Sequence, residues 1–411
     1  MADVPGEDPG PKITDIDTVI RAHVDLLKGN LSTLVVCLSR SWGGLEQVAA
    51  QDSLELAALG LEVRVLCLEG TPIHENLAHR REVQVVPLQR VPRNTFDLEM
   101  RKVLLRFFAD GVNLVHTHQT SLLASIIPWV WRRPAISVVA TRHIMNNHDK
   151  RTLFHRAVYR RLDSLIVMSQ ALKRNVLETH PLRERDVQVV NLGLDFDRFD
   201  PAKVDATAQR RAWGADDDTL VVGLVGRIDP AKGQATFIRA AAGLMKSPEL
   251  ARRARFVIVG EETLGSTTKY LGHLREMVRQ FGLEEKVVFA GFQTNIPEIM
   301  RAFDVFVMPS RQEAFGLVAI EAMAMECPII ISGGGSSDEI IGNEEFGLRV
   351  RPDDAFDLQQ KLQRMLGEPG LREAMGRRAR EHVVAHYDRK LRLLRTLEIY
   401  ERALRRRRAF A

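Results

Sequence analysis

The sequence is poor in cysteine and in aromatic residues. Only three of its 411 residues are cysteines, Cys37, Cys67 and Cys327, and they do not have the spacing of a metal site. All three lie in apolar, strand-like segments, so we expect reduced thiols in the core of a cytosolic protein. Aromatic residues make up 6% of the chain, too few for a surface that stacks on bases. We therefore expect no nucleic-acid partner.

Long apolar runs and the usual nucleotide-binding fingerprints are absent as well. No apolar run reaches the length of a membrane span. The first 15 residues are acidic and rich in proline and glycine, with no apolar signal region, and we expect residues 1–30 to be a disordered lead-in. The chain contains neither GxGxxG nor GxxxxGK[ST], which excludes the common dinucleotide and P-loop motifs.

The length and the order of the apolar segments predict two α/β domains. A chain of 411 residues is too long for one ordinary core, and 45% apolar with 27% charged residues is typical of a soluble globular protein. Short apolar strands alternate with helical segments, as in parallel, doubly wound sheets. We place the domains at residues 31–200 and 201–385, followed by a basic C-terminal helix over 386–411.

The most informative stretch is residues 304–326. Residues 305–308 form an apolar run that ends at a Pro-Ser turn, which predicts a buried strand. A loop with Glu313 and Gly316 follows, and a helix begins near Leu317, with Glu321 about one turn inside it.

This strand, loop and helix can bind a diphosphate between two polyols. The first amides of the predicted helix, from Gly316, Leu317 and Val318, would face the loop, and a helix N-terminus favours an anion. One carboxylate is then available for each polyol. The alternative is an ordinary loop and helix with two carboxylates that face solvent.

The spacing of these carboxylates resembles a known signature. Glu313 and Glu321 are separated by seven residues, with Phe315-Gly316 after the first and Ala322 after the second. The pattern resembles family 4 retaining glycosyltransferases, the group 1 glycosyl transferases of GT-B fold, and the resemblance extends over residues 31–404. It implies two Rossmann-like domains that face each other across a cleft. The N-terminal domain would take the acceptor, the C-terminal domain the nucleotide-sugar, and the final helix would cross back to the first domain.

A second motif supports this resemblance. Arg227 and Lys232 follow the apolar strand 220–225 on a loop rich in glycine and proline, where two cations can neutralise a leaving diphosphate. The family uses the arginine and lysine of this motif in that way. Phe292 lies at the end of the strand 287–292, where the family holds the nucleotide base. For Arg227 and Lys232, the alternative is that they are a chance pair of cations on the surface.

The N-terminal half carries weaker signals at strand ends. Gly43 and Gly44 follow an apolar strand and would let a ligand approach the backbone, or they only form a tight turn. His143 matches the family's histidine that contacts the donor sugar, while His116 and His118 resemble its acceptor-side HxH. Gln119 stands where many relatives carry an acid. Each histidine, taken alone, could equally be a loop hydrogen-bonder.

The resemblance implies a role for each residue in a metal-independent, retaining hexosyl transfer without a cofactor. Glu313 would face the sugar and its developing positive charge, Glu321 would accept hydrogen bonds from the ribose, and His143 would orient the sugar. Asp195 and Asp197 have the form of a metal-binding DxD, but they match a turn of the family, so we expect no metal. The expected donor-site residues are Gly43, Gly44, Arg227, Lys232, Phe292, Glu313, Phe315, Gly316, Leu317 and Glu321.

Clusters of basic residues suggest where an acceptor or a membrane could bind. The net charge is +5, with basic runs at 150–161 and 405–408. They are solvated helix faces, or they contact anionic lipid head groups or a phosphorylated acceptor. We expect a saccharide or lipid-linked acceptor, as in bacterial lipopolysaccharide synthesis, and a cytoplasmic protein located peripherally at the inner face of the membrane.

Two other functions are compatible with the same motifs. One is another GT-B activity, a nucleotide-sugar epimerase or a phosphorylase, which would turn over without an acceptor or with orthophosphate. The other is a non-catalytic protein that binds sugar nucleotides. An intact set of Arg227, Lys232, Glu313 and Glu321 argues against the latter.

Overall fold

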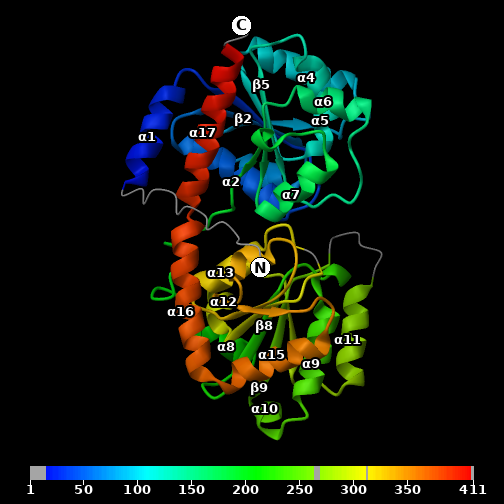
Figure 1. Cartoon of the computed structure of the whole chain (residues 1–411), viewed down its shortest axis with the longest axis vertical. Helices are drawn as coiled ribbons and strands as arrows, with labels where there is room; N and C mark the ends of the chain where they lie inside the picture. Colours follow the sequence, from blue (N-terminus) through cyan, green and yellow to red (C-terminus); the bar gives the residue numbers. More distant parts are fainter. Residues whose placement is uncertain (1–14, 263–268, 312, 409–411) are drawn as a thin grey trace, which may run out of the picture. The chain divides into compact units, whose positions relative to one another are not determined.

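Two parallel sheets organise the chain, seen in a computed structural model that describes residues 15–262, 269–311 and 313–408. Within these residues the first sheet has seven strands, in the order β3-β2-β1-β4-β5-β6-β7, and the second has six, in the order β10-β9-β8-β11-β12-β13. Neighbouring strands run parallel from β3 to β5 in the first sheet and throughout the second. The predicted α/β fold with two doubly wound sheets is confirmed (Figure 1).

Strands and helices alternate along the first half of the chain. Their bounds are α1 Ile16–Leu27, β1 Ser32–Cys37, α2 Gly44–Ala58, β2 Glu62–Leu68, α3 Pro72–Leu77, β3 Gln84–Leu88, α4 Leu98–Ala109, β4 Leu114–Thr117, α5 Leu123–Val130, β5 Ser137–Arg142, α6 Leu153–Arg160, β6 Ser164–Val167, α7 Gln170–Thr179 and β7 Val187–Val189.

The second half repeats the alternation and ends in three helices. Its elements are α8 Thr207–Ala212, β8 Leu220–Val225, α9 Gln234–Leu244, α10 Pro248–Arg253, β9 Ala254–Val259, α11 Tyr270–Gln280, β10 Val287–Gly291, α12 Ile296–Ala302, β11 Val305–Met308, α13 Leu317–Ala324, β12 Ile329–Ser332, α14 Ser337–Ile341, β13 Leu348–Val350, α15 Ala355–Gly367, α16 Pro369–His386 and α17 Arg389–Arg408.

Helices cover both faces of the second sheet, which explains its apolar central strands. Helix α9 packs against α11 and α15, and α13 packs against α12 and α16. These two groups lie on opposite sides of the sheet (Figure 1). Strands β11 and β12 are therefore buried along their whole length.

Packing contacts divide the chain into two units. Unit 1 comprises the described parts of Met1–Thr141, Arg156–Leu165 and Lys390–Ala411, and unit 2 comprises Arg142–His155 and Ile166–Arg389. The chain changes from one sheet to the other between Val189 and Leu220. Helix α17, expected to return to the first domain, packs within unit 1.

Helix α1 corrects the prediction of a disordered lead-in over residues 1–30. Asp15 caps this helix by accepting a hydrogen bond from the amide of Thr18 at 3.1 Å. One side of the helix buries Ile20, Val24 and Leu27, so its apolar spacing outweighs the polar composition of the segment before it. Residues 1–14 lie outside the described residues.

The three cysteines are buried and free, as the sequence predicts. Burial raises the pKa of Cys37 and of Cys67 to about 12, so both remain thiols at neutral pH.

Each sheet has one point where the strand order reverses. In the first sheet it lies between β1 and β4, and in the second between β8 and β11. Ligands of doubly wound proteins bind beyond the carboxyl ends of the strands at such a point. The loops after these four strands are therefore where a site is expected.

Candidate functional site

The loop after β8 carries two cations at the carboxyl end of a central strand. Arg227 follows the strand closely, and Lys232 ends a short 3-10 turn, Pro230–Lys232. Asp229 holds this turn, because its carboxylate accepts a hydrogen bond from the amide of Ala231 at 2.9 Å. Arg227 and Lys232 thus both leave the switch point of the second sheet.

Gly233 allows this loop to pack on the loop after β11. Its φ of +76° lies in the left-handed region, and a Cβ at this position would stand 2.2 Å from the carbonyl oxygen of Pro309. Both the conformation and the close approach exclude a side chain. The amide of Arg311 also donates to the carbonyl of Ala231 at 3.0 Å. The two strand-end loops are therefore in direct contact.

Glu313 lies on the loop after β11, and a glycine turn after β12 supports its backbone. A Cβ on Gly335 would stand 2.4 Å from the carbonyl oxygen of Glu313. The amide and the hydroxyl of Ser336 donate to that oxygen at 3.3 and 3.2 Å. Gly316 ends the loop with a φ of +85° and caps α13. Gly316, which ends the loop, and Gly335, which packs against its backbone, thus help to fix the position of Glu313.

A hydrogen-bonded ion pair joins the two loops. Lys232 Nζ lies 2.8 Å from Glu313 Oε2, with the side chains 29% and 18% exposed. Arg227 points elsewhere, since its guanidinium is 56% exposed and lies 3.4 Å from Asp229. The structure therefore brings together two of the residues predicted for the donor site and leaves Arg227 on the same loop, open to solvent.

Helix α13 starts at the end of the Glu313 loop. Leu317 opens the helix after Gly316, and the first amides of a helix have no partner within it. These amides and the helix dipole attract an anion. One turn further on, burial raises the pKa of Glu321 to about 7, and the positive charge of Arg198 opposes this shift. Within the described residues, the Glu321 carboxylate has no hydrogen-bond or ion-pair partner.

The two phenylalanines predicted for this site differ in exposure. Phe292, directly after β10, is 59% exposed. Phe315 is buried, and its ring meets that of Tyr387 edge-on at a centroid distance of 5.9 Å. Only the backbone of Phe315 can face a ligand, and its side chain anchors the loop.

His143 follows strand β5 at its carboxyl end and is nearly buried. Two cations, Arg142 and Lys150, act on His180 in the same unit. Burial, and then the positive charge of Arg142, lower the pKa of Lys150. Burial and the charges of Arg142 and Lys150 lower the pKa of His180 to about 3, so this imidazole is neutral. The positive charges of Arg142, which directly precedes His143, and of Lys150 thus both act on His180.

The Gly43-Gly44 turn lies between β1 and α2, at the switch point of the first sheet. The amide of Gly43 donates to Glu46 Oε2 at 2.8 Å, which closes the start of the helix. A Cβ on Gly44 would meet no atom within 4 Å, and its backbone does not have a positive φ. Neither conformation nor packing requires glycine at residue 44, which suits a position that a ligand approaches.

His116 is in the interior of unit 1, which corrects its predicted place on the acceptor side. Its side chain is 0% exposed, and its ring nitrogens lie 2.7 Å from Tyr400 Oη and 2.8 Å from Thr141 Oγ1. Burial, aided by the charge of Arg392, lowers its pKa to about 3. His116 is therefore a neutral link between β4, β5 and α17. His118 is equally buried, with its ring 4.4 Å from that of His116, so the prediction is wrong for both.

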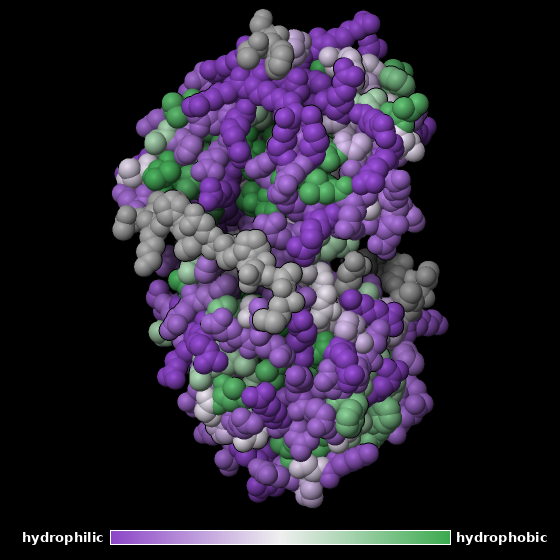
Figure 2. Space-filling model, in the orientation of Figure 1, coloured by the Kyte–Doolittle hydropathy of each residue, from purple (hydrophilic) through white to green (hydrophobic). Residues whose placement is uncertain are grey.

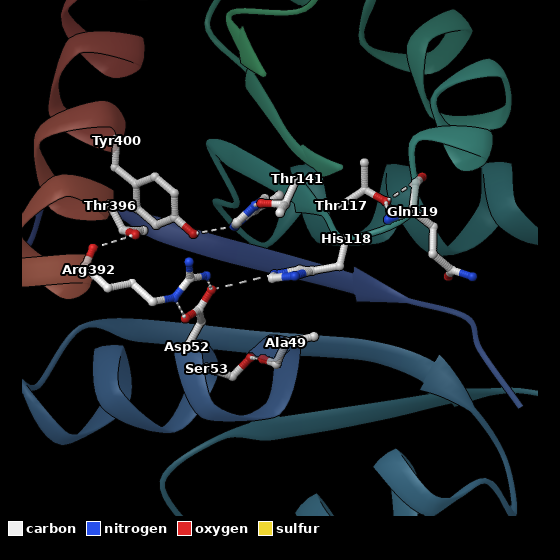
Figure 3. Close-up of polar contacts among 11 residues, drawn as sticks. Ala49, Asp52, Ser53, Thr117, His118, Gln119, Thr141, Arg392, Thr396 and Tyr400 are labelled. Carbon is white, nitrogen blue, oxygen red and sulfur yellow. Dashed lines mark hydrogen bonds and ion pairs between the residues drawn. The ribbon is translucent and has the colours of Figure 1, made fainter. Parts of the chain in front are cut away.

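An ion pair completes this buried polar cluster of Asp52, His116, His118, Arg392 and Tyr400. Figure 3 labels all of these residues except His116. Arg392 donates from Nε to Asp52 Oδ1 at 3.0 Å and from Nη2 to Oδ2 at 2.6 Å. His118 Nε2 lies 3.9 Å from the same carboxylate. The cluster connects α2 with α17.

The basic residues predicted to meet lipid or phosphate fall into two groups. Arg161 is buried and donates to the carbonyl oxygens of Arg133 and Ile136 at 3.0 and 2.6 Å. Arg407 pairs with buried Asp163 at 2.6 Å. The prediction is wrong for these two arginines, which hold the fold of unit 1. The exposed members are Arg151, Arg156, Arg160, Arg405, Arg406 and Arg408.

The described part of the chain has neither a group of metal ligands nor a membrane-spanning helix. There, no three His, Cys, Asp or Glu residues gather into a group that could hold a metal ion. None of the helices in the same residues is both long enough and apolar enough to cross a membrane.

Both halves of the chain match family models. Residues 42–198 match the model of Glycosyltransferase Family 4, and residues 205–382 match that of Glycosyl transferases group 1. A D-inositol 3-phosphate glycosyltransferase of Kribbella flavida is 30% identical over 384 residues, which cover 86% of either chain.

Solved structures share the fold. A glycosyltransferase of Rickettsia africae aligns with a TM-score of 0.81 at 21% identity, over 91% of this chain and 99% of that one. The Anabaena protein HepE, solved in complex with UDP-glucose, aligns with a TM-score of 0.74 at 21% identity, over 90% and 99% of the two chains.

Proposed function

The chain belongs to glycosyltransferase family 4, the group 1 glycosyl transferases of GT-B fold, and we propose that it moves a sugar from a nucleotide-diphospho-sugar to an acceptor hydroxyl. The observation that carries the proposal is the Lys232–Glu313 contact of 2.8 Å at the start of α13. It joins a cation and a carboxylate beside free helix amides, which is what a diphosphate next to a sugar requires.

Each of these residues binds a different part of the donor. Lys232 exchanges Glu313 for the phosphate oxygens, Arg227 turns its exposed guanidinium toward them, and the amides at the start of α13 add two donors. Glu313, released from Lys232, accepts hydrogen bonds from the transferred sugar. Glu321 accepts hydrogen bonds from the ribose.

The reaction breaks the bond between the anomeric carbon and the diphosphate. The acceptor hydroxyl attacks that carbon from the side on which the diphosphate leaves, and its proton passes to the departing phosphate oxygen. Glu313 stabilises the positive charge on the sugar, and Lys232 and Arg227 stabilise the negative charge on the diphosphate. His143 orients the sugar. The anomeric configuration is retained, and protein cations take the role that a metal would have.

The acceptor that we propose carries an anionic group beside its hydroxyls. The positive charges of Arg142 and Lys150, which both lower the pKa of His180, support an anion near these two residues. The name of the Kribbella flavida relative, which specifies an inositol phosphate, supports the same class. A lipid-linked saccharide of the cell envelope, as in lipopolysaccharide synthesis, meets this requirement if it is phosphorylated.

A thermal-shift panel tests the donor site. UDP-, GDP- and ADP-sugars are compared on the wild type, Lys232→Ala and, as a control, Lys203→Ala, an exposed lysine of unit 2 paired with Asp200. UDP-sugars come first, since HepE was solved with UDP-glucose. We expect one series to stabilise the wild type and the control, and a loss of affinity of about 10- to 100-fold in Lys232→Ala. No shift with any series contradicts the proposal.

Turnover assays separate the remaining choices. Transfer to inositol phosphate should persist in EDTA, and NMR of the product should show the anomeric configuration of the donor. Turnover without an acceptor would indicate an epimerase, and turnover that needs orthophosphate would indicate a phosphorylase.

A further inference from the structure

Exposed apolar side chains form patches on an otherwise hydrophilic surface (Figure 2). One such patch lies at the adjoining ends of α4 and α5, two helices of unit 1 that pack against each other. Phe96 and Leu98 are 66% and 71% exposed, and Trp131 is 46% exposed. We name Phe96, Leu98, Trp129 and Trp131 the α4–α5 surface.

Neighbouring groups hold these aromatic rings in place. The Phe96 ring meets Trp129 edge-on, with centroids 6.1 Å apart. The Arg101 guanidinium lies 5.4 Å from the centre of the Trp129 ring, a cation–π distance. Arg133 donates to the carbonyl of Trp129 at 2.8 Å. The surface is thus a built arrangement of aromatic rings and cations.

The charge around this surface is strongly positive. Residues 90–133 contain seven arginines and lysines but only three acids. Two of the acids, Asp97 and Glu99, are already paired with Arg90, at 2.7 and 3.3 Å. The exposed cations of the segment are Arg93, Arg101, Lys102, Arg106, Arg132 and Arg133.

We propose that the α4–α5 surface docks on an anionic lipid bilayer. Tryptophan and phenylalanine insert at the level of the lipid head groups, and surrounding arginine and lysine side chains bind lipid phosphates. A second copy of the chain fits less well, because a two-fold contact would place these cations against each other. The proposal does not depend on the donor site, since membrane binding needs neither donor nor acceptor.

Vesicle flotation of the full chain tests this surface. We expect the wild type to float with phosphatidylcholine vesicles that contain phosphatidylglycerol, and to be released by salt. The double variant Phe96→Ser/Leu98→Ser should bind at least about tenfold more weakly. Phe356→Ser is the matched control in unit 2, because Phe356 has the same 66% exposure as Phe96.

A charge-reversal pair tests the electrostatic part. Arg101→Glu/Lys102→Glu should weaken binding to anionic vesicles by at least about tenfold. Arg377→Glu/Arg378→Glu on α16, where both side chains are also exposed, should leave binding close to that of the wild type. Unchanged melting temperatures would show that all variants are folded.

Four results would overturn the proposal. The wild type fails to float, or the α4–α5 variants bind as well as the wild type. A third such result is that, among the variants, only Leu153→Ser/Phe154→Ser on α6, whose residues are 84% and 51% exposed, loses binding. The fourth is that size-exclusion chromatography shows a dimer that the double variant Phe96→Ser/Leu98→Ser dissociates, which would make this surface a protein interface.

Discussion

The buried ion pair between Asp52 and Arg392 should contribute far more to stability than an exposed pair on the same helix. Both residues are only 6% exposed, and Arg392 makes two hydrogen bonds to the carboxylate. Asp52→Ala would leave the Arg392 guanidinium buried without a counterion. Removing one partner of such a pair costs about 3–5 kcal/mol of unfolding free energy.

Helix α17 also offers a matched control. Lys390 pairs with Asp17 of α1 at 2.8 Å, with side chains 43% and 50% exposed. The contact in the buried pair is 2.6 Å, so the two pairs differ in burial rather than in distance. Solvent screens the exposed pair, and Asp17→Ala should cost about 0–1 kcal/mol.

Urea unfolding followed by tryptophan fluorescence measures both effects. Three of the four tryptophans, Trp42, Trp129 and Trp131, belong to unit 1, so the signal reports mainly on the unit that contains both pairs. Because a chain of two units need not unfold in one step, the transition of unit 1 is fitted separately. Asp52→Ala/Arg392→Met should cost clearly less than the sum of the single changes, because it no longer buries an unpaired charge.

Equal losses of unfolding free energy in Asp52→Ala and Asp17→Ala would refute this reasoning. Burial would then not determine the strength of these ion pairs. Additive costs in the Asp52 and Arg392 double variant would lead to the same conclusion, since the two side chains would be acting independently.

Two further predictions concern the proposed ligand-binding residues. Donor affinity, measured by calorimetry, should rise about tenfold between pH 6 and pH 8, because the ribose needs an ionised Glu321 and its pKa is about 7. The raised pKa also means that ionisation of Glu321 destabilises the donor-free fold as the pH rises through 7. Glu321→Gln should therefore remove the pH dependence of both donor affinity and folding stability. A pH dependence of donor affinity that persists in this variant would assign the titration to another group. Gly44→Ala should leave the melting temperature unchanged, because its Cβ meets no atom within 4 Å, yet lower the transfer rate by at least about tenfold if a ligand approaches this backbone. Full activity in Gly44→Ala would show that the glycine only forms a turn.

The sheets and the position of the Lys232 and Glu313 loops at strand ends could be predicted from the sequence because their signals are local. The apolar runs of β8 and β11 are bounded by glycine and proline, which marks both the strands and the loops after them. Parallel strands then bring the two loops to the same edge of the sheet. The contact between Gly233 and Pro309 could not be foreseen, since it depends on how two loops pack on each other.

Helix α1 shows a different limit of sequence interpretation. The first 15 residues are polar and rich in proline and glycine, and this composition favours a disordered segment at the start of the chain. Ile20, Val24 and Leu27 nevertheless follow a helical spacing and are buried in the structure. Composition averaged over a segment therefore concealed an amphipathic helix that begins within it.

The histidines show why a position at a strand end does not by itself make a binding site. His116 and Glu313 both lie near the carboxyl ends of central strands, and both have a partner within 2.8 Å. Tyr400, the partner of His116, comes from α17, which is far away in the sequence, and the His116 side chain is fully buried. Lys232, the partner of Glu313, comes from the neighbouring strand-end loop, and the pair stays partly exposed. The difference lies in which element covers the strand end, and neither strand carries that information in its own sequence.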